Sequence, residues 1–254
     1  MQITVYDEQN QNTVFDLRTL DAYSAVYCTA HYAFHYKPGS FAEKHIRSIA
    51  EEQERCFTKI TALLGIPFCD TIRYVLTNSP EENGRILEEL FGEYEPGNGF
   101  AVGPNNIFAT YSETIRCVGA HEDTHLISYA YCDPSCELLC EGLAMYMDGE
   151  WWGKPNAEWV KAFLLDGSCR SVFELADDET FRNTACEISY PIAGAFTAYL
   201  IERLGTAAFL EHIYKPKASL AEKTKQVFHK TPEEVEKGFI AWITAAQDDI
   251  TMHL

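Results

Sequence analysis

One stretch, from Ser112 to Gly149, constrains this chain most, because it places two imidazoles where a helix would turn them to one side. His121 and His125 are four residues apart within the sequence HEDTH. On a helix, such residues lie about 40° apart around the axis and one turn along it, so both rings can point at a single ion. Glu122 lies about 100° round from His121, beside such an ion rather than on it. The spacing predicts a metal-binding helix with an adjacent carboxylate that can accept a proton.

A catalytic zinc ion needs a third protein ligand and an open fourth position. Glu141 is the candidate for that ligand, and fifteen residues separate it from the second histidine of HEDTH. The surrounding residues predict a second helix, with Asp133 as its N-cap, Pro134 in its first turn and Gly149 as its stop. Fifteen residues are enough for the first helix to end and for the chain to return antiparallel, with two turns before Glu141.

The sequence HEDTH followed by CEGLAMY resembles the gluzincin metallopeptidases of the peptidase MA group, in which H-E-x-x-H precedes an E-G-x-A helix. The resemblance implies that His121, His125 and Glu141 hold one Zn²⁺ per chain. It also implies that Glu122 is the general base that activates a water molecule for attack on a peptide bond.

The chain departs from this family inside the motif and matches it again further on. Asp123 and Thr124 are more polar than the usual apolar pair, from which we expect the helix to be less deeply buried than in the relatives. A later segment, ISYPIAGAFTAYLIERLG, also resembles the family pattern. We expect its helix to begin at Tyr190, with Pro191 in the first helical position and Gly205 as the stop. The Tyr190 hydroxyl is the candidate oxyanion stabiliser, and a packed core or rim tyrosine is the alternative.

Turn signals surround two short strands predicted just before the motif, at residues 100–102 and 107–111. In the family that the chain resembles, an edge strand at this place binds the substrate backbone by strand addition. An unpaired strand edge offers hydrogen-bond donors and acceptors to an extended peptide. The alternative is a purely structural hairpin.

The charge and composition of the chain exclude several kinds of partner. The formal net charge is -18 and the isoelectric point is about 4.8. Such a surface repels phosphate backbones and anionic lipids, so we expect neither nucleic-acid nor membrane binding. The N-terminal residues lack a basic region followed by an apolar run, so we expect no signal peptide. The chain has nine cysteines, an odd number without framework spacing, which indicates reduced thiols in a cytoplasmic protein.

The rest of the chain predicts an α+β fold. Strands are expected at 2–6, 12–16, 26–36 and 71–77, and helices at 41–64, 80–91, 156–165, 171–175, 190–204, 219–228 and from 232 onward. Ser40 and Glu43 form a capping box for the helix at 41–64. His31 and His35 fall on one face of the strand at 26–36, where a polar strand face is favoured over a second metal site because no third ligand lies nearby.

We therefore expect a single metallopeptidase-like domain over residues 1–254. Its mixed N-terminal lobe (1–130) and mainly helical C-terminal lobe (131–254) would have a zinc cleft between them. The function expected is zinc-dependent hydrolysis of peptide or protein substrates. One alternative is a zinc-containing binding or regulatory protein that hydrolyses no peptide. Another is a zinc hydrolase that acts on a non-peptide amide.

Overall fold

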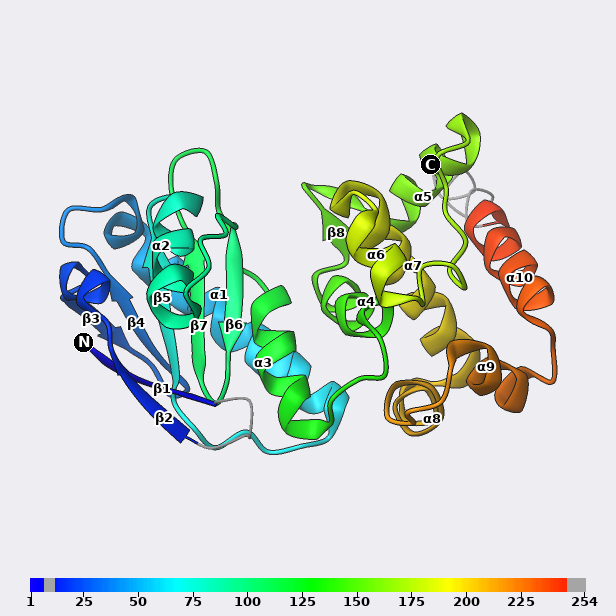
Figure 1. Ribbon diagram of the computed structural model, residues 1–254, viewed down its shortest axis with the longest axis horizontal. Helices are drawn as coiled ribbons and strands as arrows, with labels where there is room; N and C mark the ends of the chain where they lie inside the picture. The colour runs from blue at the N-terminus through cyan, green and yellow to red at the C-terminus, as the bar shows by residue number, and fades with distance from the viewer. Residues whose placement is uncertain (7–11, 246–254) are drawn as a thin grey trace. The chain divides into compact units, whose positions relative to one another are not determined.

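The computed structural model describes residues 1–6 and 12–245. These residues form two compact units, which divide between Tyr131 and Cys132. Strands are concentrated in the first unit, whereas the second is mainly helical (Figure 1). This confirms the predicted α+β class with its strand-rich N-terminal part. The zinc cleft between the two parts stays a prediction. Among the described residues, no helix is both long enough and apolar enough to cross a membrane.

The N-terminal unit is built on a five-stranded sheet in the order β3-β4-β5-β7-β6. The central strands β4, β5 and β7 run parallel, while β3 and β6 form the two edges and pair antiparallel with their neighbours. The elements of this unit are β1 (Gln2–Tyr6), β2 (Asn12–Asp16), η1 (Arg18–Ala22), β3 (Ala25–Cys28), β4 (Tyr32–Tyr36), α1 (Phe41–Leu64), β5 (Ile72–Thr77), α2 (Pro80–Phe91), β6 (Gly99–Val102), β7 (Asn106–Thr110) and α3 (His121–Tyr131).

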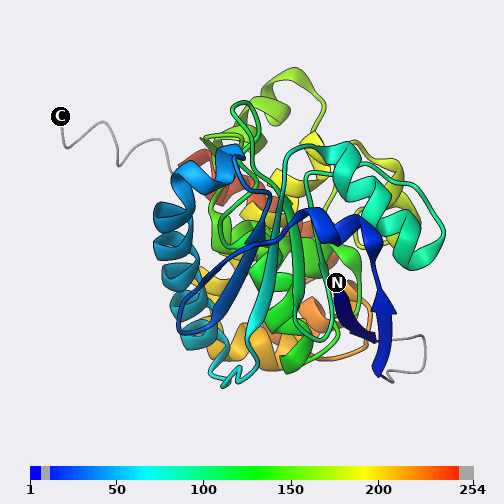
Figure 2. The same cartoon turned by 90° about the vertical axis from the view of Figure 1, so that its left-hand side faces the viewer.

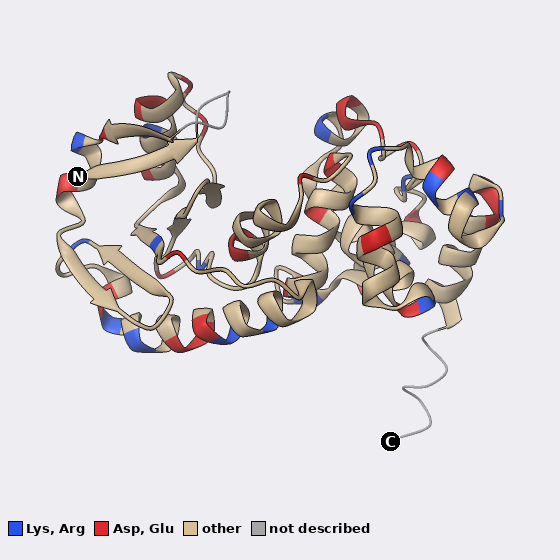
Figure 3. Ribbon diagram, turned by 90° about the horizontal axis from the view of Figure 1, so that it is seen from below, with Lys and Arg blue, Asp and Glu red and all other residues tan. Residues whose placement is uncertain are grey.

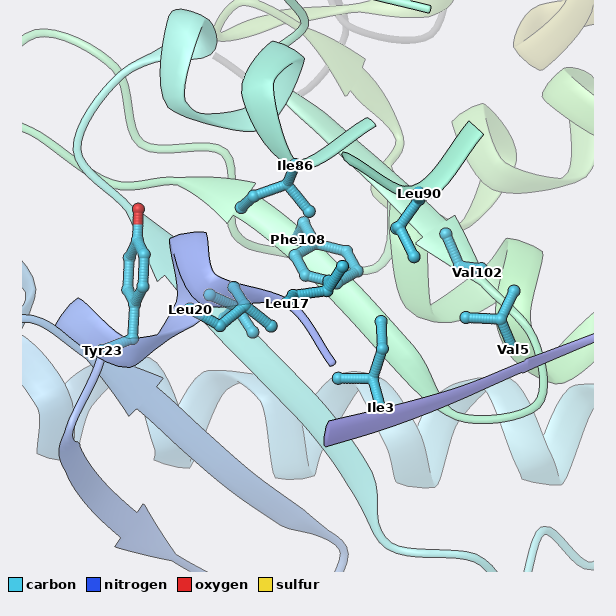
Figure 4. Close-up of a cluster of buried hydrophobic side chains, with 10 residues drawn as sticks. Ile3, Val5, Leu17, Leu20, Tyr23, Ile86, Leu90, Val102 and Phe108 are labelled. Carbon is cyan, nitrogen blue, oxygen red and sulfur yellow. The ribbon is translucent and has the colours of Figure 1, made fainter. Parts of the chain in front are cut away.

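The two faces of this sheet carry different helices, and Figure 2 shows α1 and α2 on opposite sides of the strands. Neighbouring side chains along a strand point to opposite faces. Val75 accordingly joins a buried cluster formed with α2, β1 and η1, whereas the ring of its neighbour Tyr74 packs against Tyr32 and Phe34. The cluster, drawn as sticks in Figure 4, consists of Ile3, Val5, Leu17, Leu20, Tyr23, Val75, Ile86, Leu90, Val102 and Phe108. Helix α3 packs beside α1, β6 and β7.

The long helix α1 follows the sequence signals closely. The Ser40 side chain accepts a hydrogen bond from the Glu43 amide, and Gly65 ends the helix in the left-handed conformation at φ 65°. The Glu43 carboxylate accepts from the Gly39 amide at 2.6 Å, so only one half of the predicted capping box forms. Buried side chains recur along one face of the helix and pack it onto the sheet.

The single strand predicted at 26–36 is wrong, because the chain turns there and forms the hairpin β3–β4. His31 lies in the turn rather than on the strand. Its ring pairs with the Glu54 carboxylate, with 2.6 Å between Nδ1 and Oε2, and stacks on Phe57. His31 and His35 therefore do not share a strand face, and His31 has a structural partner on α1.

The C-terminal unit is a set of packed helices with one small hairpin. Its elements are α4 (Glu137–Asp148), β8 (Glu150–Trp151), β9 (Lys154–Pro155), α5 (Asn156–Asp166), α6 (Asp178–Asn183), α7 (Cys186–Leu204), α8 (Thr206–Phe209), the π-helical turn η2 (Leu210–Tyr214), α9 (Leu220–Phe228) and α10 (Pro232–Ala245). Helices α4 and α7 approach closely because Gly142 lacks a side chain. A Cβ there would lie 2.5 Å from Thr197 Oγ1 and 2.9 Å from the Ala193 carbonyl oxygen.

Two predicted helix starts in this unit are wrong. Helix α4 begins at Glu137 rather than at Pro134, because Lys217 Nζ binds the carbonyl and the carboxylate of Asp133, each at 2.8 Å, and holds 133–135 outside the helix. Helix α7 begins at Cys186, four residues before Tyr190, and accommodates Pro191 in its interior. Proline favours the first turn of a helix; further in, it removes one backbone hydrogen bond and its ring crowds the carbonyl four residues earlier.

The predicted helix at 171–175 is wrong as well. That segment consists of turns, and the Ser171 hydroxyl and the Val172 amide both donate to the Glu236 carboxylate of α10. The helix in this region is α6, which sequence analysis missed. The Asp177 side chain caps it by accepting from the Thr180 amide at 2.9 Å.

Candidate metal centre

Helix α3 carries both histidines of the HEDTH sequence, and His121 is its first residue. The Thr124 amide and hydroxyl both donate to the Ala120 carbonyl, at 2.8 and 2.6 Å, and so begin the helical hydrogen bonding. The two imidazoles meet edge to face, with 3.2 Å between His125 Nε2 and His121 Nε2. Two nitrogen ligands at tetrahedral zinc lie about 3.3 Å apart, given Zn–N bonds of about 2.0–2.1 Å. The helix thus holds the two nitrogens at the separation that one zinc ion would need.

Glu122 is 8% exposed and faces the start of the edge strand β6. A Cβ atom at Gly99 would lie 2.6 Å from Glu122 Oε1 and 3.1 Å from Cys117 Sγ. The carboxylate therefore lies directly against the backbone of Gly99, and a residue with a Cβ there would displace it. Sequence analysis missed this role of Gly99, for which the turn-forming sequence around it gives no signal.

The expectation of a less deeply buried helix is wrong. Asp123 is 0% exposed and Thr124 is 1% exposed. The Asp123 carboxylate accepts hydrogen bonds from the Tyr32 hydroxyl and, at 3.0 Å, from Gln53 Nε2. Burial raises the pKa of the Tyr32 hydroxyl and the neighbouring Asp123 carboxylate raises it further, so Tyr32 remains a donor. The two polar residues of the motif are therefore part of the interior.

Glu141, the predicted third ligand, lies in the second turn of α4 and is partly exposed. The next residue, Gly142, lies where α4 and α7 approach closely, so this turn of the helix is firmly packed in its own unit. Among the described residues, one group of three or more His, Cys, Asp or Glu side chains could hold a metal ion, and it consists of His121, His125 and Glu141. Two imidazoles and a carboxylate are a donor set typical of catalytic zinc.

Tyr190 lies in the second turn of α7 and not at a helix start as predicted. Its ring meets Trp151 edge to face, with 5.4 Å between the centroids, and stacks against Phe181 at 6.0 Å. These contacts with β8 and α6 fix the ring within the C-terminal unit. Its role in stabilising an oxyanion stays a prediction.

No model of a known protein family matches the chain, and no curated protein matches it either. The resemblance to the gluzincins therefore depends on the HEDTH and CEGLAMY sequences, and the function must be argued from the chemistry of the side chains.

Proposed function

We propose that this protein is a zinc-dependent peptidase in which His121, His125 and Glu141 hold the metal ion. The observation that carries the proposal is the distance of 3.2 Å between the two histidine Nε2 atoms, with the carboxylate of the intervening Glu122 buried nearby. A hydrogen bond between two neutral imidazoles has a similar length, so the buried acid beside the histidines and the third ligand Glu141 distinguish this pair from two incidental histidines. Only the five residues 132–136 separate α3 from α4, so Glu141 follows the histidines closely along the chain.

The residues of the chain would divide the reaction among them. The zinc ion, when bound, would polarise the scissile carbonyl and lower the pKa of a water molecule. Glu122 would accept the proton of that water and pass it to the leaving amine.

Strand β6 is the proposed binding element for the substrate backbone. In the described part of the chain, it pairs only with β7 and forms one edge of the sheet. An extended peptide that adds to this edge would pass the backbone of Gly99, against which the Glu122 carboxylate lies. The side chain that takes the proton would then stand next to the bound peptide.

Peptides and proteins are the proposed substrates, and the cytoplasm is the proposed location. Acidic residues outnumber basic ones by 38 to 20, and Figure 3 shows them spread over many elements. This charge disfavours nucleic acids and anionic lipids as partners. The alternative of a zinc-containing binding protein rests partly on the polar residues Asp123 and Thr124 and partly on the absence of a recognisable exopeptidase anchor. The burial of the two polar residues gives them a structural purpose and removes the first of these reasons.

Metal content and hydrolysis together test the proposal. We expect about one zinc ion per chain in the wild type and in Glu122→Gln, and much less in Glu141→Ala. Glu137→Ala is the matched control, because Glu137 lies one turn earlier on α4 and pairs with Arg182 rather than with a metal ion. Glu122→Gln should retain zinc and lose cleavage of a quenched-fluorescence peptide library. Full cleavage by that variant, or a wild type that takes up no zinc, would overturn the proposal.

A further inference from the structure

A buried polar network ties helix α3 to α1 and β4. Gln53 of α1 binds Gly119 through both backbone groups: its Oε1 accepts from the Gly119 amide at 2.9 Å, and its Nε2 donates to the Gly119 carbonyl at 3.0 Å. The same Nε2 donates to Asp123. The Tyr32 hydroxyl completes the network. It contacts the Asp123 carboxylate and, at 3.1 Å, the backbone carbonyl oxygen of Gln53.

The network holds the chain on both sides of the candidate metal ligand His121. Gly119 lies two residues before His121, and Asp123 lies two residues after it. His121 is also the first residue of α3, where no preceding turn of helix fixes the backbone. Helix ends fray readily. The two hydrogen bonds between the Gln53 side chain and the Gly119 backbone restrain the chain just before His121, as a preceding helical turn would.

Burial makes this arrangement specific. Tyr32, Gln53 and Asp123 are each 0% exposed. A buried polar group without a hydrogen-bond partner raises the free energy of the folded state. The folded state therefore favours the one arrangement in which the hydrogen bonds of the network are all made. The network can therefore set the direction of the first turn of α3, and not only its stability.

We propose that Gln53, Asp123 and Tyr32 are positioning residues that hold His121 at its distance from His125 before any metal ion binds. This inference rests on the proposed function. A first turn that is ordered only part of the time binds zinc more weakly, in proportion to the fraction of time that it is ordered. Residues that orient metal ligands indirectly typically contribute about 10- to 100-fold to metal affinity.

The zinc dissociation constant of purified, metal-free protein tests the inference, with Zn²⁺ titrated against a chromophoric chelator well below the melting temperature. We expect Gln53→Leu to weaken zinc binding by about 10- to 100-fold. Tyr32→Phe removes a single hydroxyl and serves if Gln53→Leu does not fold; its affinity should fall by several-fold. Ile60→Val is the matched control, since Ile60 is a buried residue of the same helix outside the network, and its zinc affinity should stay within about twofold of the wild type.

Hydrogen exchange of the Gly119 amide gives a second reading that does not depend on the metal ion. The amide should exchange faster in Gln53→Leu, and at an unchanged rate in Ile60→Val. If Gln53→Leu and Ile60→Val both have lowered melting temperatures but Gln53→Leu binds zinc with unchanged affinity, the positioning role is overturned. The proposed function would still stand in that case. A wild type that binds no zinc would overturn both.

Discussion

Gly99→Ala tests whether the place of Glu122 against strand β6 matters for catalysis. The added Cβ would lie 2.6 Å from Glu122 Oε1, whereas real Cβ contacts keep at least 3.0 Å. The carboxylate must therefore retreat by about 0.4 Å or more, the difference between those two distances. Cys117 Sγ and Glu122 Cδ lie 3.1 Å from the same point, so the thiol and the whole carboxyl group are crowded together with Oε1. The backbone of Gly99 lies outside the left-handed region, so alanine adds no backbone strain there.

The expected loss follows from the size of this displacement. Misplacement of a reacting group by 1 Å can lower a rate by about 100-fold. A shift of about 0.4 to 1 Å should therefore lower kcat by about 6- to 100-fold, which is about 1.1–2.7 kcal/mol in activation free energy. Zinc content should stay at the wild-type level, because Glu122 is not a proposed ligand. Single-turnover cleavage of a quenched peptide, together with elemental analysis, measures both quantities.

Gly97→Ala is the matched control for this experiment. It makes the same change two residues earlier, where the nearest atom to the new Cβ is the Gly99 carbonyl oxygen at 3.9 Å. We expect wild-type turnover from this variant. Turnover within about twofold of wild type in Gly99→Ala would refute the assigned place of Glu122, and loss of zinc would show that the substitution acts through the metal site instead.

Two further predictions concern stability. Trp152 occupies the first loop position of the β8–β9 hairpin at φ 51°, with Gly153 after it at φ 77°, and is 63% exposed. Trp152→Asn should therefore raise the unfolding free energy by about 1 kcal/mol, since asparagine is favoured at that position; a lower melting temperature would contradict this. The pKa of Glu82 is lowered although burial raises it, because hydrogen bonds from Lys37 and Tyr23 outweigh burial. Glu82→Gln should lose about 1–2 kcal/mol at pH 7, and the deficit should shrink as the pH falls through the folded pKa of Glu82 and the wild type loses the same interaction. A deficit that persists in acid would contradict this assignment.

Local signals were enough to predict much of the fold. Capping by Ser40 and the glycine stop at Gly65 fixed the bounds of α1, and the 80–91 helix and the short strands before HEDTH also lie where their patterns indicate. These features depend on side chains within a few residues of one another. The failures come from distant partners. Lys217 draws Asp133 away from a capping role across 84 positions of sequence, which no local pattern reveals.

The polar pair inside HEDTH shows most clearly why the candidate site could be only partly predicted. The types and spacing of its histidines follow from the sequence, whereas the environment of Asp123 does not, because its partner Tyr32 lies 91 positions earlier. Read alone, an aspartate indicates exposure. Because Asp123 is hydrogen-bonded to the buried side chains of Tyr32 and Gln53, it fills a position in the interior as an apolar residue would. It also adds directional hydrogen bonds there. An apolar residue at this position would leave the Tyr32 hydroxyl only the Gln53 backbone carbonyl as an acceptor and would remove its hydrogen bond to a carboxylate, at a cost of about 1–3 kcal/mol. The buried position of Asp123 on α3 therefore depends on Tyr32 of β4, so the local sequence of the motif alone does not determine it.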